Sequence, residues 1–350
     1  MIGSKGDLRV VVITGASAGV GRAIAQEFAS QGWWVGLMAR GRAGLAGAQA
    51  DVRKRGGAAL VLPIDVTDAA AVERAAQEVM QHWGQIDLWI NAAMATVLAP
   101  VSRITPDEFR RVTEVTYLGQ VFGTQAALRH MRRQGRGTIV SIGSALAYRG
   151  IPLQAPYCAA KFATRGFLDA LRAELLHEKS PVRLTEVHLP AVNTPQFDWA
   201  RNKMPHRAQP VPPVHQPEAI AQAIYRAALE APREVWLAGS AVRAIIGDAA
   251  APALVDRLLA QDGYSGQQTE DLAHERPDNL FEPMDDLEDH GASGRFGDGA
   301  RTYVTAYRPV QLRAAGMAIG FAVLYGATRL LRALTPSKEA TKRSRPRKGS

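Results

Sequence analysis

The sequence predicts a doubly wound α/β fold built on a parallel sheet of about seven strands. Longer stretches of helical period separate short apolar runs near residues 9–14, 33–39, 59–63, 86–90, 138–142, 182–188 and 234–238. Regular alternation of this kind is typical of a parallel sheet with helices on both faces. The runs RVVVIT and GTIVSI are apolar on both faces, as central strands covered by helices must be. In such folds, ligands bind at the carboxyl ends of the strands.

The first strand leads directly into TGASAGVGRAIA, residues 14–25. Its glycines, Gly15, Gly19 and Gly21, permit a tight turn, a close approach of the backbone to a phosphate, and close packing of helix on strand. A glycine trio alone is weak evidence, because turns use glycine freely. Its position between a strand and an amphipathic helix predicts a dinucleotide-binding site.

The end of the second strand, GLMAR, bears on the type of dinucleotide. An NAD site usually places an acid there to bond the ribose 2′-hydroxyl, whereas the 2′-phosphate of NADP needs a cation. Here Ala39 occupies the position of the acid and Arg40 follows, with Arg22 and Arg42 as further cations. We therefore expect NADP(H) as the cofactor. The alternative is that these arginines are solvated surface residues.

The segment APYCAAK, residues 155–161, follows the fifth predicted strand. If it is helical, Tyr157 and Lys161 lie on the same face, one turn apart. An ammonium beside a phenol favours the phenolate and lowers its pKa, which makes the phenol a usable acid or base near neutral pH. The alternative is a surface helix that carries a packed tyrosine and a lysine.

Composition and charge exclude several other classes of protein. Of the 350 residues, 47% are hydrophobic, as in folded chains. Cys158 is the single cysteine, which excludes a disulfide framework and fits a reducing compartment. The net charge of +9 lies entirely in residues 308–350, which hold ten Lys/Arg and only Glu339. The rest of the chain is neutral, so we expect no nucleic-acid partner. No secretory signal or paired metal-ligand spacing is recognised, and we expect a cytoplasmic protein without a metal.

Residues 8–240 resemble the short-chain dehydrogenase/reductase family. The resemblance rests on TGASAGVG after the first strand, Asp65 in PIDVTD, NAAM at 91–94, Ser144 after the fifth strand, YCAAK thirteen residues after that serine, and LPAVNT at 189–194. These motifs occur in the family's order and spacing. The resemblance implies a Rossmann-type fold and an NADP(H)-dependent oxidoreductase that interconverts a carbonyl and an alcohol.

The resemblance also implies roles for individual residues. Tyr157 would be the acid in carbonyl reduction and the base in alcohol oxidation. Lys161 would lower its pKa and hold the nicotinamide ribose, and Ser144 would hydrogen-bond the substrate carbonyl. Asp65 would contact the adenine, and Thr194 the carboxamide.

Further cofactor contacts are expected along the same edge of the sheet. Asn91 would lie at the cofactor-side backbone near the fourth strand. The other residues expected at the cofactor are Gly15, Ser17, Gly19, Val20, Gly21, Arg40 and Val66. Family habit implies a homodimer or homotetramer.

Three positions depart from the family's pattern. Met94 and Ala191 replace glycines that follow the fourth and sixth strands. Thr116 stands where the family commonly has an asparagine that helps to hold a water linking the lysine to solvent. We therefore count Thr116 among the catalytic candidates and expect a weakened proton relay. This departure supports the rival hypothesis, a non-catalytic NADP(H)-binding scaffold or redox sensor.

The variable wall of the site suggests a lipophilic substrate. The candidate substrate-binding residues are Met94, Leu146, Tyr148 and Phe197. Apolar side chains at these positions favour a lipophilic ketone, aldehyde or alcohol. The alternative is that they only pack the loops against the domain.

The chain continues for about a hundred residues beyond the family core. We expect a cofactor-binding domain over residues 1–240, an extension of a helix and an extended strap over 241–307, and an apolar helix with a basic tail over 308–350. The stretch 312–334 is mostly apolar and precedes six basic residues. It could lie on the cytoplasmic face of a membrane or pack on its own domain.

Overall fold

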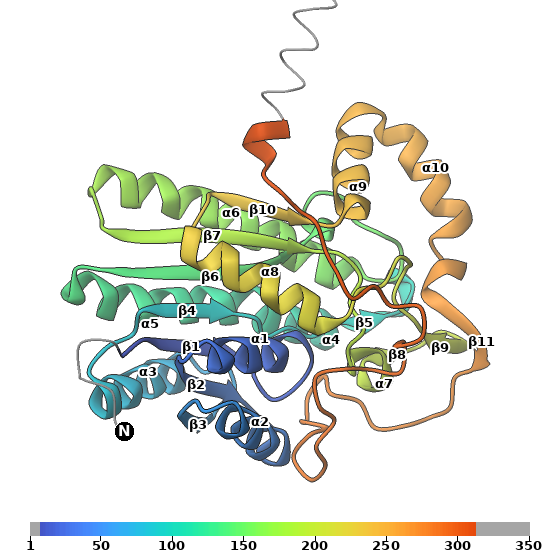
Figure 1. Cartoon of the computed structure of the whole chain (residues 1–350). Helices are drawn as coiled ribbons and strands as arrows, with labels where there is room; N and C mark the ends of the chain where they lie inside the picture. The colour runs from blue at the N-terminus through green and yellow to red at the C-terminus, as the bar shows by residue number, and fades with distance from the viewer. Residues whose placement is uncertain (1–7, 313–350) are drawn as a thin grey trace, which may run out of the picture. The chain divides into compact units, whose positions relative to one another are not determined.

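A computed structural model describes residues 8–312 of the chain (Figure 1). Contacts divide the chain into two units, Met1–Tyr307 and Arg308–Ser350. Residues 241–307, which we expected as a separate extension, belong to the first unit. In the second unit only residues 308–312 are described. The predicted apolar helix, apart from residue 312, and the basic tail lie outside the described residues.

The first unit is built on an eight-stranded sheet, as far as the described residues show, in the order β12-β10-β7-β6-β4-β1-β2-β3. Its strands are β1 (Val10–Thr14), β2 (Trp34–Ala39), β3 (Ala59–Pro63), β4 (Leu88–Asn91), β6 (Gly137–Ser144), β7 (Val182–Leu189), β10 (Glu234–Leu237) and β12 (Ala306–Tyr307). The first seven pair in parallel, which confirms the predicted fold class. The eighth, β12, comes from the extension and pairs antiparallel with β10.

Helices cover both faces of the sheet. Successive residues of each strand point to opposite faces, so each strand contributes to both helical layers. Val11 and Ile13 face one helical layer, whereas Val10 and Val12 face the other. The first layer holds α1 (Gly19–Ser30), α2 (Arg42–Lys54) and α8 (Pro217–Glu230). The second holds α3 (Ala69–Trp83), α5 (Gly119–Gln134) and α6 (Ala155–His177). The strands are therefore buried on both faces, as their apolar runs predict.

Local signals explain where several helices begin and end. Helix α4 (Pro106–Thr113) begins with a capping box, in which Thr105 and Glu108 each accept a bond from the other's backbone N–H. The side chain of Asp68 caps α3 at its start. Gly84 and Gly135 end α3 and α5 in the left-handed conformation that glycine adopts without strain. A π-helical turn, Glu114–Leu118, joins α4 to α5.

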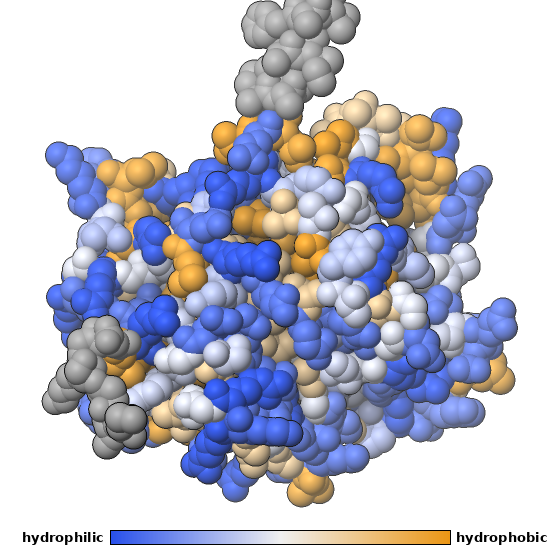
Figure 2. Space-filling view, viewed as in Figure 1, coloured by the Kyte–Doolittle hydropathy of each residue, from blue (hydrophilic) through white to orange (hydrophobic). Residues whose placement is uncertain are grey.

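Smaller elements surround the carboxyl ends of the strands. The short strands β5 (Val97–Leu98) and β8 (Arg201–Asn202) pair in parallel, and β9 (His206–Ala208) pairs antiparallel with β11 (Gln268–Leu272). Helix α7 (Gln196–Trp199) follows β7, while α9 (Gly239–Ala250) and α10 (Pro252–Asp262) follow β10. Figure 2 shows apolar surface over α9 and α10, to which the exposed side chains of Ile246, Leu254 and Leu258 contribute. Three-residue 3₁₀ turns occur at Val101–Arg103, Ala145–Ala147 and Ser265–Gln267.

Residues 273–305, which we call the strap, run from β11 past α7 and α2 and back to the sheet edge at β12 (Figure 1). Leu280 anchors the strap, because its side chain is fully buried among apolar residues near β5 and α4. The Gly291 carbonyl accepts a hydrogen bond from the Gly19 N–H at the start of α1. The strap therefore runs along the ligand-binding edge of the sheet. None of the helices within residues 8–312 has the length and apolar character needed to cross a membrane.

Candidate active site

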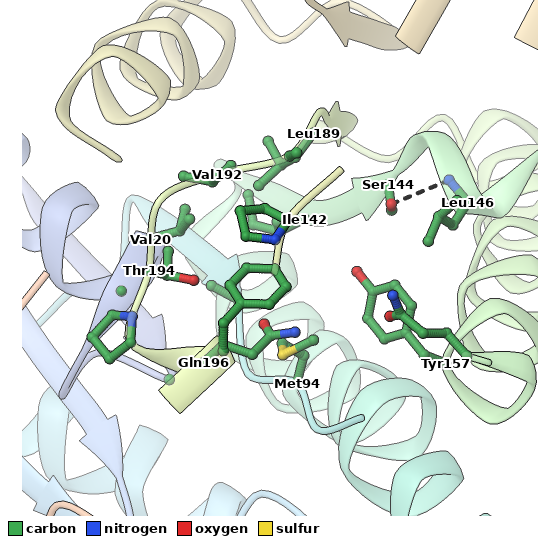
Figure 3. A pocket seen from close by; sticks show the side chains of 18 of the residues that line it. Val20, Met94, Ile142, Ser144, Leu146, Tyr157, Leu189, Val192, Thr194 and Gln196 are labelled. Carbon is green, nitrogen blue, oxygen red and sulfur yellow. Dashed lines mark hydrogen bonds between the residues drawn. The ribbon is translucent and has the colours of Figure 1, made fainter. Parts of the chain in front are cut away.

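A cavity of about 540 Å³ lies at the carboxyl ends of the strands and is large enough for a small organic ligand (Figure 3). One end is lined by the glycine-rich turn after β1, and the other by side chains that follow β6 and by α6. Most of the predicted site residues line it: Gly15, Ser17, Gly19, Val20, Gly21, Arg40, Asp65, Val66, Met94, Ser144, Leu146, Tyr157, Lys161, Thr194 and Phe197. Three predicted residues, Asn91, Thr116 and Tyr148, are not part of the lining.

The glycine-rich turn has no room for side chains. A Cβ on Gly15, whose φ is +70°, would lie 2.8 Å from the Cα of Ala93. A Cβ on Gly21 would lie 2.1 Å from the carbonyl oxygen of Gly15. The turn therefore brings bare backbone and the amino end of α1 to the cavity, which is the arrangement that binds a dinucleotide pyrophosphate. These residues fit a dinucleotide cofactor.

At the end of the cavity that the motif order assigns to adenosine, Asp65 is held in place by its neighbours. Its carboxylate accepts bonds from the N–H and hydroxyl of Thr67, at 3.0 and 2.9 Å, and from Arg111 at 2.6 Å. Burial acts to raise the pKa of Asp65, but the bonds from Arg111 and Thr67 outweigh it and lower the pKa. Asp65 is therefore a fixed carboxylate acceptor at this end.

Arg40 lines the same end, but its guanidinium is bonded to the strap. It donates to the carbonyl oxygens of Asn279 and Phe281, each at 2.6 Å. Burial and the nearby Arg111 lower the pKa of Arg40. The residue predicted to meet a 2′-phosphate is thus positioned by residues that the sequence motifs do not include.

At the other end, the side chains of Ser144, Tyr157 and Lys161 line the cavity, and Figure 3 shows the first two. Ser144 is the last residue of β6, and its hydroxyl accepts a bond from the Leu146 N–H at 3.1 Å. Tyr157 lies on α6, and its hydroxyl is a close neighbour of the Ser144 hydroxyl. Lys161 lies one turn further along α6, with its Nζ 5.5 Å from the centre of the tyrosine ring. The predicted trio is therefore brought together.

The pKa of Tyr157 moves in the direction opposite to the one predicted. Burial of the phenol raises its pKa, and the neighbouring Ser144 hydroxyl opposes this only in part. Burial also lowers the pKa of Lys161 to about 8, against the opposing effect of Glu186. The amine of Lys161 donates to the Ile142 carbonyl at 2.6 Å, so its interaction with the phenol is weaker than a direct contact would be.

Thr116, predicted to support a proton relay, instead makes hydrogen bonds to the backbone within the wall of the site. Its hydroxyl donates to the carbonyl of Ala95 and accepts from the Ala95 N–H, both at 3.0 Å. The side chain is fully buried and does not line the cavity. The position therefore ties the π-helical turn to the loop after β4.

Asn91 and Tyr148 are also directed away from the cavity. The amide of Asn91 accepts a bond from Trp89 at 2.8 Å and donates to Thr124 at 3.0 Å, so the side chain fixes the end of β4 from behind. The hydroxyl of Tyr148 donates to Glu234, and its ring packs edge-on against His188. Tyr148 is consequently not placed to contact a substrate.

Helices α9 and α10 contribute to the cavity in a way that sequence reasoning missed. Ser240, Ala241 and Ala244 of α9 line it, together with Leu259 of α10. A bond of 2.7 Å from Gln154 to Gln267 joins this region to the start of α6. The extension is therefore part of the site wall. The sequence shows that residues 241–261 are partly apolar, but this pattern does not indicate which part of the domain they pack against.

These features define a class of protein. A glycine-rich turn that fits a dinucleotide, joined by one cavity to a Ser-Tyr-Lys group at the end of β6 and the start of α6, is the arrangement of a nicotinamide-dependent oxidoreductase. The family model of the short chain dehydrogenases matches residues 9–205, and the chain belongs to that family.

Relatives and solved structures agree with this assignment. The chain is 30% identical over 290 residues, which are 81% of each chain, to a Bacillus subtilis protein named uncharacterized oxidoreductase YxnA. It is 30% identical over 229 residues to a fatty acyl-CoA reductase of Acinetobacter baylyi, across 65% of this chain and 75% of that one. An alcohol dehydrogenase from Thermococcus sibiricus, complexed with 5-hydroxy-NADP, is similar with a TM-score of 0.56 and 27% identity, over 66% of this chain and 96% of that one.

Proposed function

We propose that this oxidoreductase interconverts a carbonyl and an alcohol with a nicotinamide cofactor, and that Tyr157 transfers the proton. The observation that carries the proposal is the placement of the Tyr157 and Ser144 hydroxyls across one cavity, with the amine of Lys161 buried one turn away. Aromatic hydroxyl, aliphatic hydroxyl and amine together provide a proton donor, a carbonyl-binding group and a cation.

A bound nicotinamide supplies the hydride in this chemistry. In the direction of reduction, Ser144 donates a hydrogen bond to the substrate carbonyl oxygen and fixes its position. Tyr157 then gives its proton to the same oxygen as negative charge develops there. The raised pKa of Tyr157 keeps the phenol protonated before the reaction. The cation of Lys161, one turn away, stabilises the phenolate that remains.

A lipophilic substrate fits the side chains at this end of the cavity. Met94, Leu146 and Phe197 line it, and Leu259 adds an apolar side chain from the extension. One relative in the family is named a fatty acyl-CoA reductase, which supports a substrate with a long apolar part. For the cofactor, Arg40 and the 5-hydroxy-NADP complex of a similar structure support NADP(H). The choice between NAD(H) and NADP(H) depends on how the strap shapes the adenosine end.

Replacing Tyr157 by Phe tests the proposal. We expect the rate of NAD(P)H oxidation with a panel of lipophilic ketones and aldehydes to fall about 10²- to 10⁴-fold, because the proton donor is lost. The affinity for the cofactor, measured by its fluorescence, should stay close to that of wild type. Tyr225→Phe is the matched control, since Tyr225 packs against Phe28 in the core rather than at the cavity.

Two results would contradict the proposal in different ways. A Tyr157→Phe protein that keeps more than about a tenth of the wild-type rate would remove Tyr157 as the acid and base. A wild-type protein that binds the cofactor but reduces no member of the panel would favour the scaffold or sensor. The scaffold hypothesis draws its support from Thr116, whose hydroxyl is buried in the wall and does not reach the cavity.

A further inference from the structure

The adenosine end of the cavity contains a carboxylate from the strap. Asp285 lines the cavity and is 7% exposed. Its side chain occupies the space left by two glycines, because its oxygens would lie 1.9 Å from a Cβ on Gly41 and 2.5 Å from a Cβ on Gly44. The same Cβ on Gly44 would lie 3.0 Å from Ser17 of the glycine-rich turn. Asp285 thus sits between the end of β2 and the turn after β1.

Within residues 8–312 no hydrogen bond or ion pair holds the carboxylate of Asp285, although the charge of Arg40 acts on it from nearby. Its main-chain oxygen is bound, since it accepts from the Gly44 N–H at 2.9 Å. The backbone is therefore fixed while the side chain is left with its acceptors unused. A buried carboxylate without a partner is costly unless a ligand provides donors.

The groups that would bind a 2′-phosphate are already occupied by the strap. At the start of α2, the Arg42 N–H donates to the side chain of Asp286 at 3.1 Å, and the Ala43 N–H donates to its carbonyl at 3.2 Å. With Gly44 bound to Asp285, the first three N–H groups of this helix all have partners.

The nearby guanidinium groups are bonded in the same way. Arg22 is paired with Asp51 and with Asp289 of the strap. Arg40 donates to two strap carbonyls. Arg42 is exposed. Within the described part of the chain, its side chain has no hydrogen-bond or ion-pair partner.

We propose that Asp285 determines cofactor specificity and selects NAD(H) over NADP(H). An NAD site usually carries an acid at the end of the second strand, where this chain has Ala39. Asp285 supplies that acid from the extension. Its carboxylate accepts a hydrogen bond from the 2′-hydroxyl of the adenosine ribose, and it repels a phosphate at the same position. This inference rests on the proposed function and opposes the preference that Arg40 alone suggests.

The test compares the dissociation constants of NAD⁺ and NADP⁺, measured by titration calorimetry, for wild type and Asp285→Asn. We expect wild type to bind NAD⁺ at least about tenfold more tightly than NADP⁺, because a buried carboxylate repels the added phosphate. In Asp285→Asn this ratio should fall by about tenfold or more, mainly through tighter NADP⁺ binding. Pairs of 5′-AMP and 2′,5′-ADP should show the same change, which places it at the adenosine end.

Asp298→Asn is the matched control, since it makes the same substitution on the same strap at an exposed residue that does not line the cavity. Its ratio should equal that of wild type. An unchanged melting temperature for Asp285→Asn would show that the strap keeps its fold. If the variant melts lower, Asp285→Ser provides a second substitution that keeps a small polar side chain.

Two outcomes would overturn the inference: a wild type that prefers NADP⁺, or an Asp285 variant with the wild-type ratio. Both are binding measurements and need no turnover. A protein that prefers NAD⁺ through Asp285 but reduces no carbonyl would contradict the proposed function and leave this inference intact.

Discussion

His188 is a fully buried histidine held between two carboxylates, directly behind the site. Its Nε2 lies 3.2 Å from Glu234 and 3.6 Å from Glu186, and its Nδ1 is 3.0 Å from the Ser144 carbonyl. Burial acts to lower the pKa of His188, but the two glutamates outweigh it and raise the pKa to about 9. Burial acts to raise the pKa of Glu234, but His188 and Tyr148 lower it to about 2. A protonated His188 can therefore donate to Ser144 and hold the end of β6.

This arrangement predicts a loss of stability at alkaline pH. Because the folded-state pKa of His188 is raised above its ordinary value of 6.5, its contribution is fully present below about pH 6.5. The contribution disappears as the pH rises through about 9, and the difference corresponds to roughly 3 kcal/mol. Urea unfolding of wild type and His188→Gln at pH 6, 7.5 and 9.5 measures it.

The comparison of the two proteins isolates the effect of His188. The lowered pKa of Lys161 acts with the opposite sign, because deprotonating a buried lysine relieves a cost of burial. Lys161 titrates near pH 8 in the folded protein, whereas the contribution of His188 is lost through about pH 9, so the two effects differ in both sign and pH range. A difference in unfolding free energy that stays constant from pH 6 to 9.5 would show that His188 is not the titrating group.

Some site residues could be predicted from sequence, and others could not. Tyr157 and Lys161 are related by one helical turn, so their common face follows from local geometry alone. Tyr148 could not be placed in this way, because its direction depends on a bond to Glu234, which begins the distant strand β10. The unexpected direction of the Tyr157 pKa has the same origin, since burial depends on the whole fold.

The strap is the element that most changes the site, and a small number of contacts secure it. Leu280 is fully buried against Val66, Val112 and other apolar residues. Arg111 donates to the Leu280 carbonyl at 3.0 Å while it also holds Asp65. The anchor of the strap and the adenosine end of the cavity therefore share one arginine.

Leu280→Ala should destabilise the protein by about 2–5 kcal/mol, because it leaves a cavity in a closely packed cluster. We also expect faster proteolysis within residues 273–305, since the strap loses its apolar anchor. Thermal unfolding and limited proteolysis measure the two effects. Leu287→Ala is the matched control, because Leu287 lies on the same strap and is 95% exposed. Equal melting temperatures for the two variants would show that Leu280 is not an anchor.

At the level of elements, the pattern of apolar residues predicted the longer strands but not the short one. The first seven strands of the sheet have short apolar runs, and all were found. The strand β12 has two residues, too few for a pattern, and its pairing with β10 depends on the path of the strap. That path is set by individual contacts, such as the bonds from Arg40 and Arg111, that no periodic pattern encodes.

For the whole molecule, the candidate active site and the excess of basic residues belong to different units. Every residue that lines the cavity belongs to Met1–Tyr307, whereas the basic excess of the sequence lies in Arg308–Ser350. The predicted dimer or tetramer and the predicted membrane contact remain predictions. The site can therefore be studied apart from the second unit.

A chain that ends at Tyr307 should keep the melting temperature and cofactor affinity of the full chain, because it retains the first unit and β12. A chain that ends at Thr305 should melt at a lower temperature, since it exposes the edge of β10. Thermal unfolding of the three proteins compares them. Equal stability of the two shorter chains would show that β12 adds nothing to the sheet.

The strap is tied down at both ends, by β11 on β9 and by β12 on β10. Between these ties it crosses the glycine-rich turn at Gly291, and Gly294 lies against Thr194. We expect a dinucleotide bound at the glycine-rich turn to lie next to this crossing, so that its release is coupled to breaking these middle contacts. Since tethered chain segments reclose quickly, such an opening would be brief. Because each hydride transfer changes the redox state of the coenzyme, it must be exchanged once per turnover, and we expect its release to limit the steady-state rate.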